Sequence, residues 1–293
     1  MTSSCEKVSP AKINLYLEIK GRRVDGYHDI ESLMTFCHYG DILKVERAQS
    51  FNLSIQGPYA KLLENQANLI ELSLKKLEEF FNQKFKVNVL LTKNLPISSG
   101  MAGGSSNVAT FIRCLEEIYD LKDLDGFDDL LLSIGSDVPF CYHGKTAIVE
   151  SIGESLFFVE NFKSYFILLV NPNIEISTKE VFESLNLKYT SNKNQNFKKS
   201  HPIIDIDFTK KRDNVLQKSV ERKNRLIKDL LHFLSSCSGS LLTRMTGSGA
   251  TCYSLFANKK DLENAKKMTQ KTFKSYWIQD SKLVNSVEDI KLV

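Results

Sequence analysis

The chain has 293 residues, of which 42% are hydrophobic and 25% are charged. This composition is that of an ordinary globular protein, and the length suits two modest domains that share an interface. The formal net charge of +4 suits a polyanionic ligand. Because the basic residues form no concentrated stripe with interleaved aromatics, we expect no nucleic-acid partner, and an RNA-binding module is disfavoured.

The thiols and the N-terminal segment bear on the compartment. The six cysteines are scattered without a CxxC pair, and the five histidines form no HExxH motif. We therefore expect reduced thiols and no protein metal site. The opening MTSSCEKVSPAK has no apolar core of signal-peptide length, and the most apolar run, at 165–170, is too short to cross a bilayer. We expect a cytoplasmic protein with no membrane partner, as a monomer or weak homodimer.

The first half of the chain opens with a predicted strand. Apolar residues alternate over Ile13–Ile19, and this period places Lys12 and Asn14 together on the opposite face. Asn68, followed three residues later by a glutamate, predicts the N-cap of a helix. A second strand is predicted over 85–91 from the same alternation.

A glycine- and serine-rich stretch, SSGMAGGSSN at 98–107, follows this second strand and precedes a predicted helix that extends to Tyr119. A further short helix is predicted to end near Gly135, because glycine is a common C-terminal stop. The segment leading to Pro139 cannot continue it, since the residue before a proline avoids helical angles.

The second half contains a buried strand, a capped helix, a long amphipathic helix, another strand and a closing helix. We predict the first four at Tyr165–Val170, from Ser177, from about Asn214 and at Thr251–Phe256. Residues 190–211, rich in Lys, Asn and Ser, are interpreted as a surface connection. Strands and helices interleave, so the fold class is α/β or α+β, with expected domains at 1–158 and 159–293.

The glycine-rich stretch has the features of a phosphate-binding loop. A helix begins with unpaired N–H groups and partial positive charge, which together attract anions. Glycines at Gly100, Gly103 and Gly104 let the backbone approach a ligand closely. Ser105 and Ser106 are interpreted as helix caps and hydroxyl donors. Taken alone, the stretch is equally compatible with a flexible linker.

Two familiar phosphate loops are excluded. Gly144-Lys145-Thr146 imitates the end of a Walker A motif, but Pro139 stands where the first glycine belongs. Gly247-Ser248-Gly249 begins like a dinucleotide fingerprint, but Cys252 replaces its last glycine. The loop therefore belongs to another kind of nucleotide fold.

Three separated segments carry a resemblance to a known superfamily. They are SPAKINLYLEIKGRRVDGYHDIESL at 9–33, LPISSGMAGGSSNVAT at 95–110 and RMTGSGATCYSLF at 244–256. In this order they resemble the three signature motifs of the galactokinase–homoserine kinase–mevalonate kinase–phosphomevalonate kinase (GHMP) superfamily. The resemblance implies an α+β GHMP kinase fold. An N-terminal domain like domain 2 of ribosomal protein S5 would hold the ATP loop, and a C-terminal ferredoxin-like domain would close the active site.

Within this superfamily, the first segment and GSDVPF at 135–140 resemble the kinases that act on 4-diphosphocytidyl-2-C-methyl-D-erythritol, in the non-mevalonate isoprenoid route. The implied partners are ATP, accompanied by Mg²⁺, and this diphosphocytidyl-methylerythritol. The implied reaction phosphorylates the 2-hydroxyl and releases ADP. A kinase for another alcohol, such as homoserine or mevalonate, and a non-catalytic nucleotide-binding protein stay open as alternatives. The DGYH segment disfavours a kinase for another alcohol. The presence of Lys12 and Asp137 disfavours a non-catalytic nucleotide-binding protein.

Lys12 and Asp137 match the catalytic pair of this family. An ammonium beside a carboxylate favours the ionised carboxylate and also neutralises charge on a transferred phosphoryl group. Without the resemblance, a surface lysine and a loop aspartate would be the better interpretation.

The ATP-binding residues implied by the resemblance comprise the glycine-rich loop and three residues around the adenine. Family kinases usually have Leu-Gly where this chain has Met101-Ala102, and alanine fits there only if its φ is negative. The full set is Asn68, Leu69, Lys93, Pro96, Ser98, Ser99, Gly100, Met101, Ala102, Gly103, Gly104, Ser105 and Ser106.

The implied acceptor-substrate residues come from both halves of the chain. Aromatic faces can sandwich a pyrimidine, and the third motif would close over the phosphates. The set is Asn14, Tyr27, His28, Thr178, Phe182, Gly247, Ser248 and Gly249. Family members often carry an Asn-Asp-Leu-Glu-like run where this chain has Asn214-Val215-Leu216-Gln217. Because both carboxylates are missing, we place no metal or catalytic role there, and expect Mg²⁺ to be held by nucleotide oxygens, water and Ser106.

Overall fold

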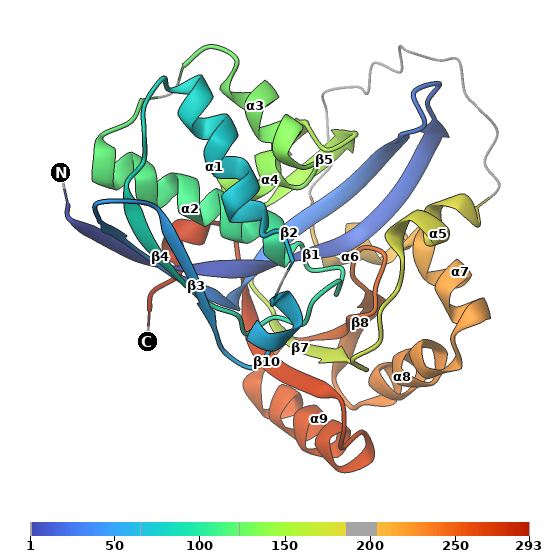
Figure 1. Ribbon diagram of the computed structural model, residues 1–293. Coiled ribbons are helices and arrows are strands. Elements are labelled where there is room, and N and C mark those ends of the chain that lie inside the picture. Colours follow the sequence, from blue (N-terminus) through green and yellow to red (C-terminus); the bar gives the residue numbers. More distant parts are fainter. Residues whose placement is uncertain (1, 65, 123, 186–203, 293) are drawn as a thin grey trace.

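The structure is a computed structural model that describes residues 2–64, 66–122, 124–185 and 204–292. Part of the predicted surface connection, 190–203, lies outside these residues. Helices and strands alternate along the chain and build one twisted sheet with helices packed against it (Figure 1).

The first half is organised around a long antiparallel hairpin. Strands β1 (Ser4–Arg22) and β2 (His28–Arg47) pair along most of their length. Strand β4 (Val87–Thr92) pairs antiparallel with β2, and β3 (Asn52–Gln56) pairs parallel with β4. Towards the other end of β2, β5 (Ala147–Ser151) and β6 (Ser155–Phe158) continue the sheet.

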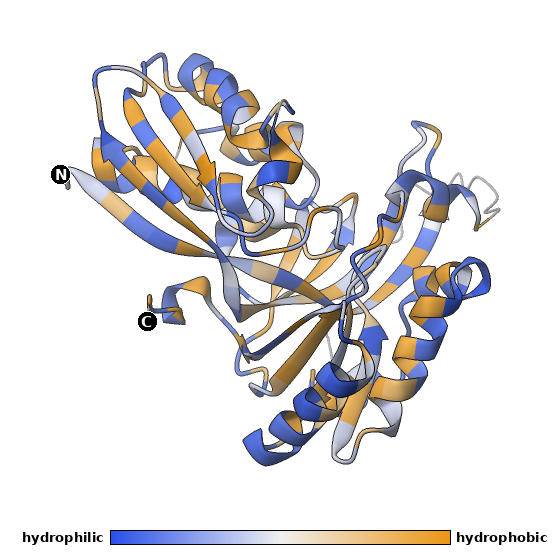
Figure 2. Cartoon of the chain, turned by 60° about the horizontal axis from the view of Figure 1, so that its bottom comes forward, coloured by the Kyte–Doolittle hydropathy of each residue, from blue (hydrophilic) through white to orange (hydrophobic). Residues whose placement is uncertain are grey.

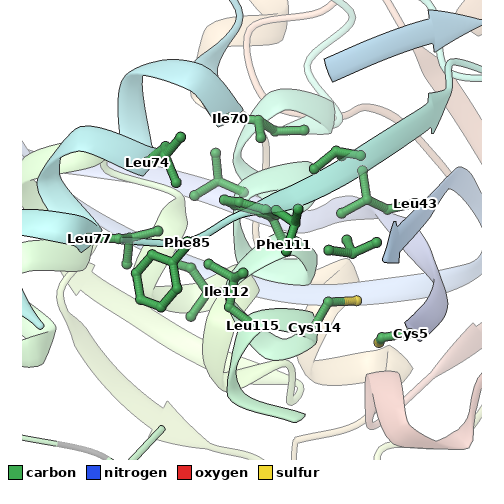
Figure 3. Close-up of a cluster of buried hydrophobic side chains, with 14 of the residues drawn as sticks. Cys5, Leu43, Ile70, Leu74, Leu77, Phe85, Phe111, Ile112, Cys114 and Leu115 are labelled. Carbon is green, nitrogen blue, oxygen red and sulfur yellow. The ribbon is translucent and has the colours of Figure 1, made fainter. Parts of the chain in front are cut away.

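Helices cover one face of this sheet and bury the first core. They are α1 (Leu69–Phe80), α2 (Gly103–Tyr119), α3 (Phe127–Ile134) and α4 (Val138–His143), with a 3₁₀ turn at Ala60–Leu63. Apolar residues of α2 recur every three or four positions, and Phe111 and Leu115 face Phe85 and Ile70 in a fully buried cluster (Figure 3). Figure 2 shows apolar residues on the helix surfaces turned toward the sheet. This packing fixes the start of α2 above β1.

The second half has the strand–helix–strand–strand–helix–strand order of a ferredoxin-like domain. Its strands are β7 (Phe166–Asn171), β8 (Ser240–Met245), β9 (Cys252–Phe256) and β10 (Trp277–Val284), in the spatial order β10-β7-β9-β8. Between β7 and β8 lie α5 (Thr178–Glu183), α6 (Ile206–Lys210), α7 (Val215–Lys223) and α8 (Arg225–Ser236). Helix α9 (Lys259–Thr272) precedes β10, and a 3₁₀ turn at Val287–Asp289 follows it.

The two halves share hydrogen bonds between their strands. In β10, Leu283 and Val284 pair with Cys37 and Phe36 of β2, so the strands of both halves form one ten-stranded sheet within the described part of the chain. Among the described residues, no helix has the length and apolar character that a membrane crossing requires.

Several predicted elements need correction. The helix predicted from Asn214 is two helices, because Asn224 ends α7 and its side chain caps α8. The predicted surface connection contains the short helix α6, capped by Asp205. Strands β2, β3, β5, β6, β8 and β10 and helix α4 were not predicted at all. The N-caps at Asn68 and Ser177 are confirmed by their side-chain hydrogen bonds.

Candidate active site

The glycine-rich loop connects β4 to α2 through a strained backbone. Ser98, Gly100 and Ala102 have positive φ values of 49°, 76° and 52°. Ala102 is the N-cap residue of α2 and is left-handed. The expectation that alanine would need a negative φ here is therefore wrong. The left-handed conformation costs a residue with a Cβ about 1–2 kcal/mol, which the surrounding contacts must offset.

The two serines after the glycines are not caps, contrary to the prediction. Both lie inside the first turn of α2, and no side chain caps that turn. The Ser106 hydroxyl is buried and donates to the Pro10 carbonyl at 2.8 Å, which ties the helix start to β1. The amide groups of Gly103 and Gly104 have no acceptor within the helix and line an open cleft. A helix start of this kind favours an anion.

A cleft of about 580 Å³ lies between this loop, β1, α5 and the loop that joins β8 to β9. Four predicted loop or third-motif residues are not part of its lining, namely Met101, Ser105, Ser106 and Gly249. The structure brings most of the predicted residues together around it: Lys12, Asn14, Asn68, Leu69, Lys93, Pro96, Ser98, Ser99, Gly100, Ala102, Gly103, Gly104, Asp137, Thr178, Phe182, Gly247 and Ser248.

Lys12 and Asp137 meet at the floor of the cleft. The Lys12 ammonium lies 3.4 Å from a carboxylate oxygen of Asp137, and their side chains are 5% and 31% exposed. Lys12 also donates to Asn14 at 2.9 Å, which confirms that both residues share one face of β1. Asn14 in turn donates to Ser32 at 2.8 Å. The pair is held by its neighbours and is open to the cleft on the carboxylate side.

Asp137 occupies the N-cap position of α4, but its side chain makes no capping hydrogen bond. Asp137 therefore does not cap its own helix. Burial, and then the nearby Asp137 carboxylate, raise the pKa of the Cys141 thiol. The thiol beside the pair is consequently neutral at physiological pH and adds no negative charge next to Lys12 and Asp137.

The third-motif loop packs backbone to backbone against the glycine-rich loop. A Cβ on Gly100 would lie 2.3 Å from the Thr246 carbonyl oxygen, and one on Gly247 would lie 2.8 Å from the Gly100 carbonyl oxygen. The Thr251 amide donates to the Ser99 carbonyl at 3.2 Å. Asn214, to which we assigned no role, donates to the Gly247 carbonyl at 2.8 Å and so anchors this loop.

At the adenine end of the predicted site, Lys93 is buried and is not a surface lysine. Its ammonium pairs with Asp41 at 2.5 Å. The second carboxylate oxygen of Asp41 accepts from the amides of Asn94 and Leu95, both at 2.8 Å. Asp41 therefore fixes the entry to the glycine-rich loop. Sequence reasoning missed it because 52 positions separate it from Lys93.

At the opposite end, the predicted pyrimidine residues are arranged unevenly. The His28 ring lies 5.0 Å from the Phe182 ring, centroid to centroid, at 39°. Tyr27 is 58% exposed, and neither it nor His28 lines the cleft. Burial, and then Arg22, lower the pKa of His28, which favours a neutral imidazole on Phe182. Thr178 and Ser248 share a hydrogen bond of 2.7 Å across the cleft wall.

Residues at the rim of the cleft were also missed. Leu63, Ile97 and Ile176 line it, and nothing in their local periodicity indicates a site. Near them, Tyr59 donates to the Asn173 side chain at 3.2 Å and so joins the two halves across the rim. Burial raises the pKa of Tyr59 to about 12, which keeps this hydroxyl a donor at neutral pH.

The side chains do not build a magnesium site. Within the described ranges no group of three or more His, Cys, Asp or Glu is arranged to hold a metal ion. Ser106, expected beside Mg²⁺, uses its hydroxyl on Pro10, and Asp137 is paired with Lys12. We therefore assign no chemical step to a metal held by the protein.

Comparisons with known proteins agree with this architecture. Residues 68–145 match the family model of the GHMP kinases N terminal domain, and residues 199–275 match that of the GHMP kinases C terminal domain. The chain is 32% identical over 291 residues to the 4-diphosphocytidyl-2-C-methyl-D-erythritol kinase of Chelativorans sp. (strain BNC1), covering 98% of this chain and 99% of that protein. It is 36% identical over 311 residues to the enzyme of the same name from Prochlorococcus marinus (strain MIT 9515), covering 97% and 96%.

Solved structures show the same fold. A crystal structure of 4-(cytidine 5'-diphospho)-2C-methyl-D-erythritol kinase superposes with a TM-score of 0.75 at 25% identity, covering 95% of this chain and 99% of that one. The homoserine kinase of Cytophaga hutchinsonii superposes with a TM-score of 0.68 at 13% identity, covering 98% and 96%, and supports the fold alone.

An uncapped helix start facing a paired lysine and aspartate, on a fold with these two domains, defines a GHMP-type small-molecule kinase. Two relatives that are more than 30% identical to this chain over nearly its whole length show which family of GHMP kinases it belongs to. The chain belongs to the 4-diphosphocytidyl-2-C-methyl-D-erythritol kinase family.

Proposed function

We propose that this protein transfers the γ-phosphoryl group of ATP to the 2-hydroxyl of 4-diphosphocytidyl-2-C-methyl-D-erythritol, giving the 2-phosphate and ADP. The observation that carries the proposal is the 3.4 Å pair of Lys12 and Asp137 in the same cleft as the uncapped start of α2. Membership of the family supports the choice of acceptor.

ATP is assigned to the half of the cleft formed by the glycine-rich loop. The exposed amides of Gly103 and Gly104 and the positive end of α2 suit the triphosphate. Leu69 and the buried Lys93 lie near the same glycines, since a Cβ on Gly104 would meet Leu69 and one on Gly103 would meet Lys93. The base is therefore placed between α1 and the loop. Mg²⁺ enters with the nucleotide and is held by phosphate oxygens and water.

In the proposed reaction, Asp137 accepts the proton of the substrate 2-hydroxyl. The oxygen of this hydroxyl bonds to the γ-phosphorus of ATP, while the bond between the γ-phosphorus and the β,γ-bridging oxygen breaks and ADP leaves. Lys12 lies beside Asp137 and offsets negative charge on the phosphoryl group during transfer. Phosphoryl transition states are usually loose, so positioning and charge stabilisation contribute most. General-base assistance adds about 10²–10⁴-fold.

The cytidine end is assigned to the side of the cleft near α5. Phe182 lines the cleft there and His28 already covers one part of its ring, so the base stacks on the remaining surface. Thr178 and Ser248 offer hydroxyl groups beside it. Tyr27 is exposed next to His28 and is placed at the outer edge of this subsite.

Three broader expectations belong to the same proposal. We place the domain boundary after residue 158, where β6 ends before β7 begins the ferredoxin-like half. All six cysteines are free and buried, which supports a cytoplasmic setting. A monomer or weak homodimer is the working unit in this proposal.

The decisive experiment is an ATP-dependent assay with diphosphocytidyl-methylerythritol, homoserine and mevalonate, with mass spectrometry of the products. We expect phosphorylation of the first compound alone.

Asp137→Asn and Lys12→Ala should each lower kcat by about 10²–10⁴-fold, with smaller changes in KM. Lys7→Ala, on the same strand but outside the cleft, is the matched lysine control, and Asp128→Asn is the matched carboxylate control. Normal turnover by Asp137→Asn contradicts its role as the base.

The cytidine assignment has its own test in Phe182→Ala. Loss of one stacked base, worth about 1–3 kcal/mol, should raise KM for the cytidylyl substrate about 5- to 150-fold. KM for ATP should change little. Phe158→Ala removes an exposed ring outside the cleft and serves as control. An unchanged KM for the cytidylyl substrate would show that Phe182 packs against its neighbours and does not bind the base.

A further inference from the structure

The strand that carries Lys12 is interrupted where it enters the cleft. The pairing of β1 with β2 runs from Asn14, opposite Met34, directly to Tyr16, opposite Leu33. Leu15 is therefore a bulge residue without a partner on β2. A bulge leaves backbone groups outside the ladder and changes the direction of the strand. The carbonyl groups around Leu15 need other donors, because they are buried.

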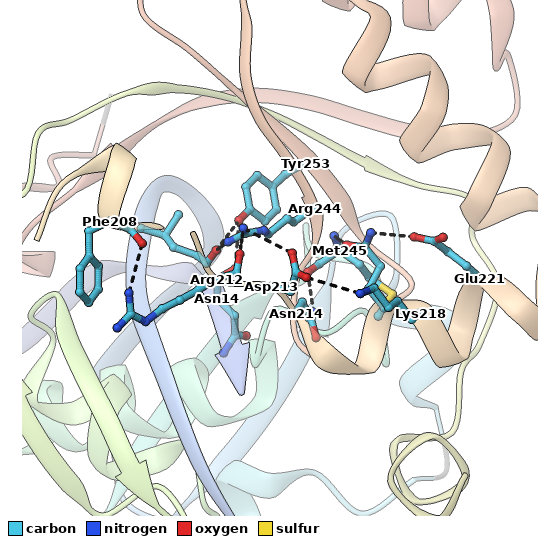
Figure 4. A network of polar contacts seen from close by, with 12 residues as sticks. Asn14, Phe208, Arg212, Asp213, Asn214, Lys218, Glu221, Arg244, Met245 and Tyr253 are labelled. Atoms are coloured by element: carbon cyan, nitrogen blue, oxygen red, sulfur yellow. Dashed lines mark hydrogen bonds and ion pairs between the residues drawn. The ribbon is translucent and has the colours of Figure 1, made fainter. Parts of the chain in front are cut away.

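Two side chains of the C-terminal half supply these donors. Arg244 of β8 and Tyr253 of β9 are directly paired across the two strands and are 5% and 0% exposed. The single hydrogen of the Tyr253 hydroxyl is shared between the Asn14 carbonyl at 3.1 Å and the Leu15 carbonyl at 3.4 Å. The Arg244 guanidinium donates to the Leu15 carbonyl as well and to the Arg212 carbonyl. Figure 4 shows both side chains converging on this stretch of β1.

The same stretch is held from its amide side. The Asn14 amide donates to the Thr246 hydroxyl at 3.0 Å, and Thr246 also donates to the Gly100 carbonyl at 3.4 Å. Three residues of the β8–β9 hairpin thus hold the backbone of Asn14 and Leu15. From that backbone one further contact leads to the reacting group, the 2.9 Å hydrogen bond of Lys12 to the Asn14 side chain.

We propose that Arg244 and Tyr253 are positioning residues that aim Lys12 into the cleft, acting through the bulge in β1 and the Asn14 side chain that holds its ammonium. The inference deepens the proposed function and rests on it. Neither side chain lines the cleft, so each acts through the strand and not on a substrate. A guanidinium presents its donors in a fixed planar fork and can hold two carbonyls at once, whereas the rotating donors of a lysine at the same place would give less directional control. A displacement of the reacting groups by about 1 Å can lower a rate about 10²-fold.

The test uses Tyr253→Phe and Arg244→Lys in the full-length protein. We expect kcat to fall about 10-fold for the first and about 10- to 100-fold for the second, with KM for ATP within about threefold of the parent. Tyr119→Phe and Arg47→Lys are matched controls, because these side chains also donate to backbone carbonyls but do not line the cleft. The controls should keep kcat within about twofold.

The Lys12→Ala background separates positioning from simple stability. If Tyr253 acts through Lys12, adding Tyr253→Phe to Lys12→Ala should lower the residual single-turnover rate less than twofold. An equal loss in both backgrounds, or an unchanged kcat in the single variant, overturns the inference. Should Arg244→Lys not fold, Tyr253→Phe still decides, because it removes only a hydroxyl group. Failure of the parent protein to phosphorylate any acceptor would instead contradict the proposed function.

Discussion

The two glycine loops of the cleft lead into different elements. The loop before α2 continues as a 17-residue helix, whereas the loop between β8 and β9 returns directly as a strand. In the second loop, positive φ values occur at glycines, Gly247 and Gly249, but in the first they also occur at Ser98 and Ala102. The first loop is strained at the point where it presents helix amides.

This difference separates two uses of glycine. In the first loop, Gly103 and Gly104 leave backbone amides accessible to a ligand. In the contact between the loops, Gly100 and Gly247 let two backbones approach each other, with no room for a Cβ. Substitutions at these positions should therefore have distinct effects on binding and stability.

Gly100→Ala should have the largest effect. Its φ is 76°, and a Cβ would lie 2.3 Å and 2.9 Å from the Thr246 and Gly249 carbonyl oxygens. Strain and overpacking together should lower the free energy of unfolding by about 2–5 kcal/mol and abolish most activity. Urea denaturation measures the loss. Gly26→Ala, with φ of 90° and no atom within 4 Å of the new Cβ, is the control for strain alone. Equal losses in the two variants would show that the backbone contact is unimportant.

Gly247→Ala should have a smaller effect of the same kind. The new Cβ would lie 2.8 Å from one carbonyl oxygen, that of Gly100, at a φ of 55°. We expect a loss of about 1–3 kcal/mol and a tenfold or greater fall in kcat/KM. Gly126→Ala is the comparison, because it combines positive φ with open space. A variant as active as the parent would mean that the loops need not touch.

Gly104→Ala should separate stability from binding. This glycine lies in the first turn of α2, and a Cβ would make ordinary contact with Leu69 at 3.7 Å. Alanine should raise the free energy of unfolding by about 0.5 kcal/mol through its helix propensity. Its methyl group would occupy space in the cleft, so KM for ATP should rise at least fivefold. A higher stability with an unchanged KM would remove Gly104 from the nucleotide site.

Ala102→Gly should have the smallest effect, in the stabilising direction. Relief of the left-handed conformation outweighs the added entropy of the unfolded chain, for a net gain of about 0.5–1 kcal/mol. Asp120→Gly at the other end of α2, where φ is 55°, should give a similar gain. Thermal unfolding of both variants checks this. A loss of stability in Ala102→Gly alone would show that the methyl group has packing value there.

Local patterns predicted the local parts of the fold. The N-cap at Asn68 and the strand carrying Lys12 depend on a few adjacent residues, and both are confirmed. The break at Asn224 was missed because apolar residues continue on both sides of it, from Val220 to Ile227. The sign of φ at Ala102 was predicted wrongly, since that conformation is imposed by packing that no local pattern encodes.

The residues of the site show the same contrast between local patterns and contacts that form only in the folded chain. Motif resemblance, not periodicity, led to Lys12 and Asp137, which are 125 positions apart and meet only in the folded chain. The contributions of Asp41, Thr246 and Asn214 depend on hydrogen bonds to distant backbone groups, and single-sequence reasoning had no means of finding them.

The strand pairing between the two halves also limits how substrates reach the cleft. Swinging one half away from the other would break the β10–β2 pairing and the bonds that fix the bulge in β1. The Tyr59–Asn173 contact at the rim is a single exposed hydrogen bond. Entry and exit of the nucleotide should therefore depend on small local motions of the segments around Tyr59 and Asn173. The part of β1 that carries Lys12 should not move.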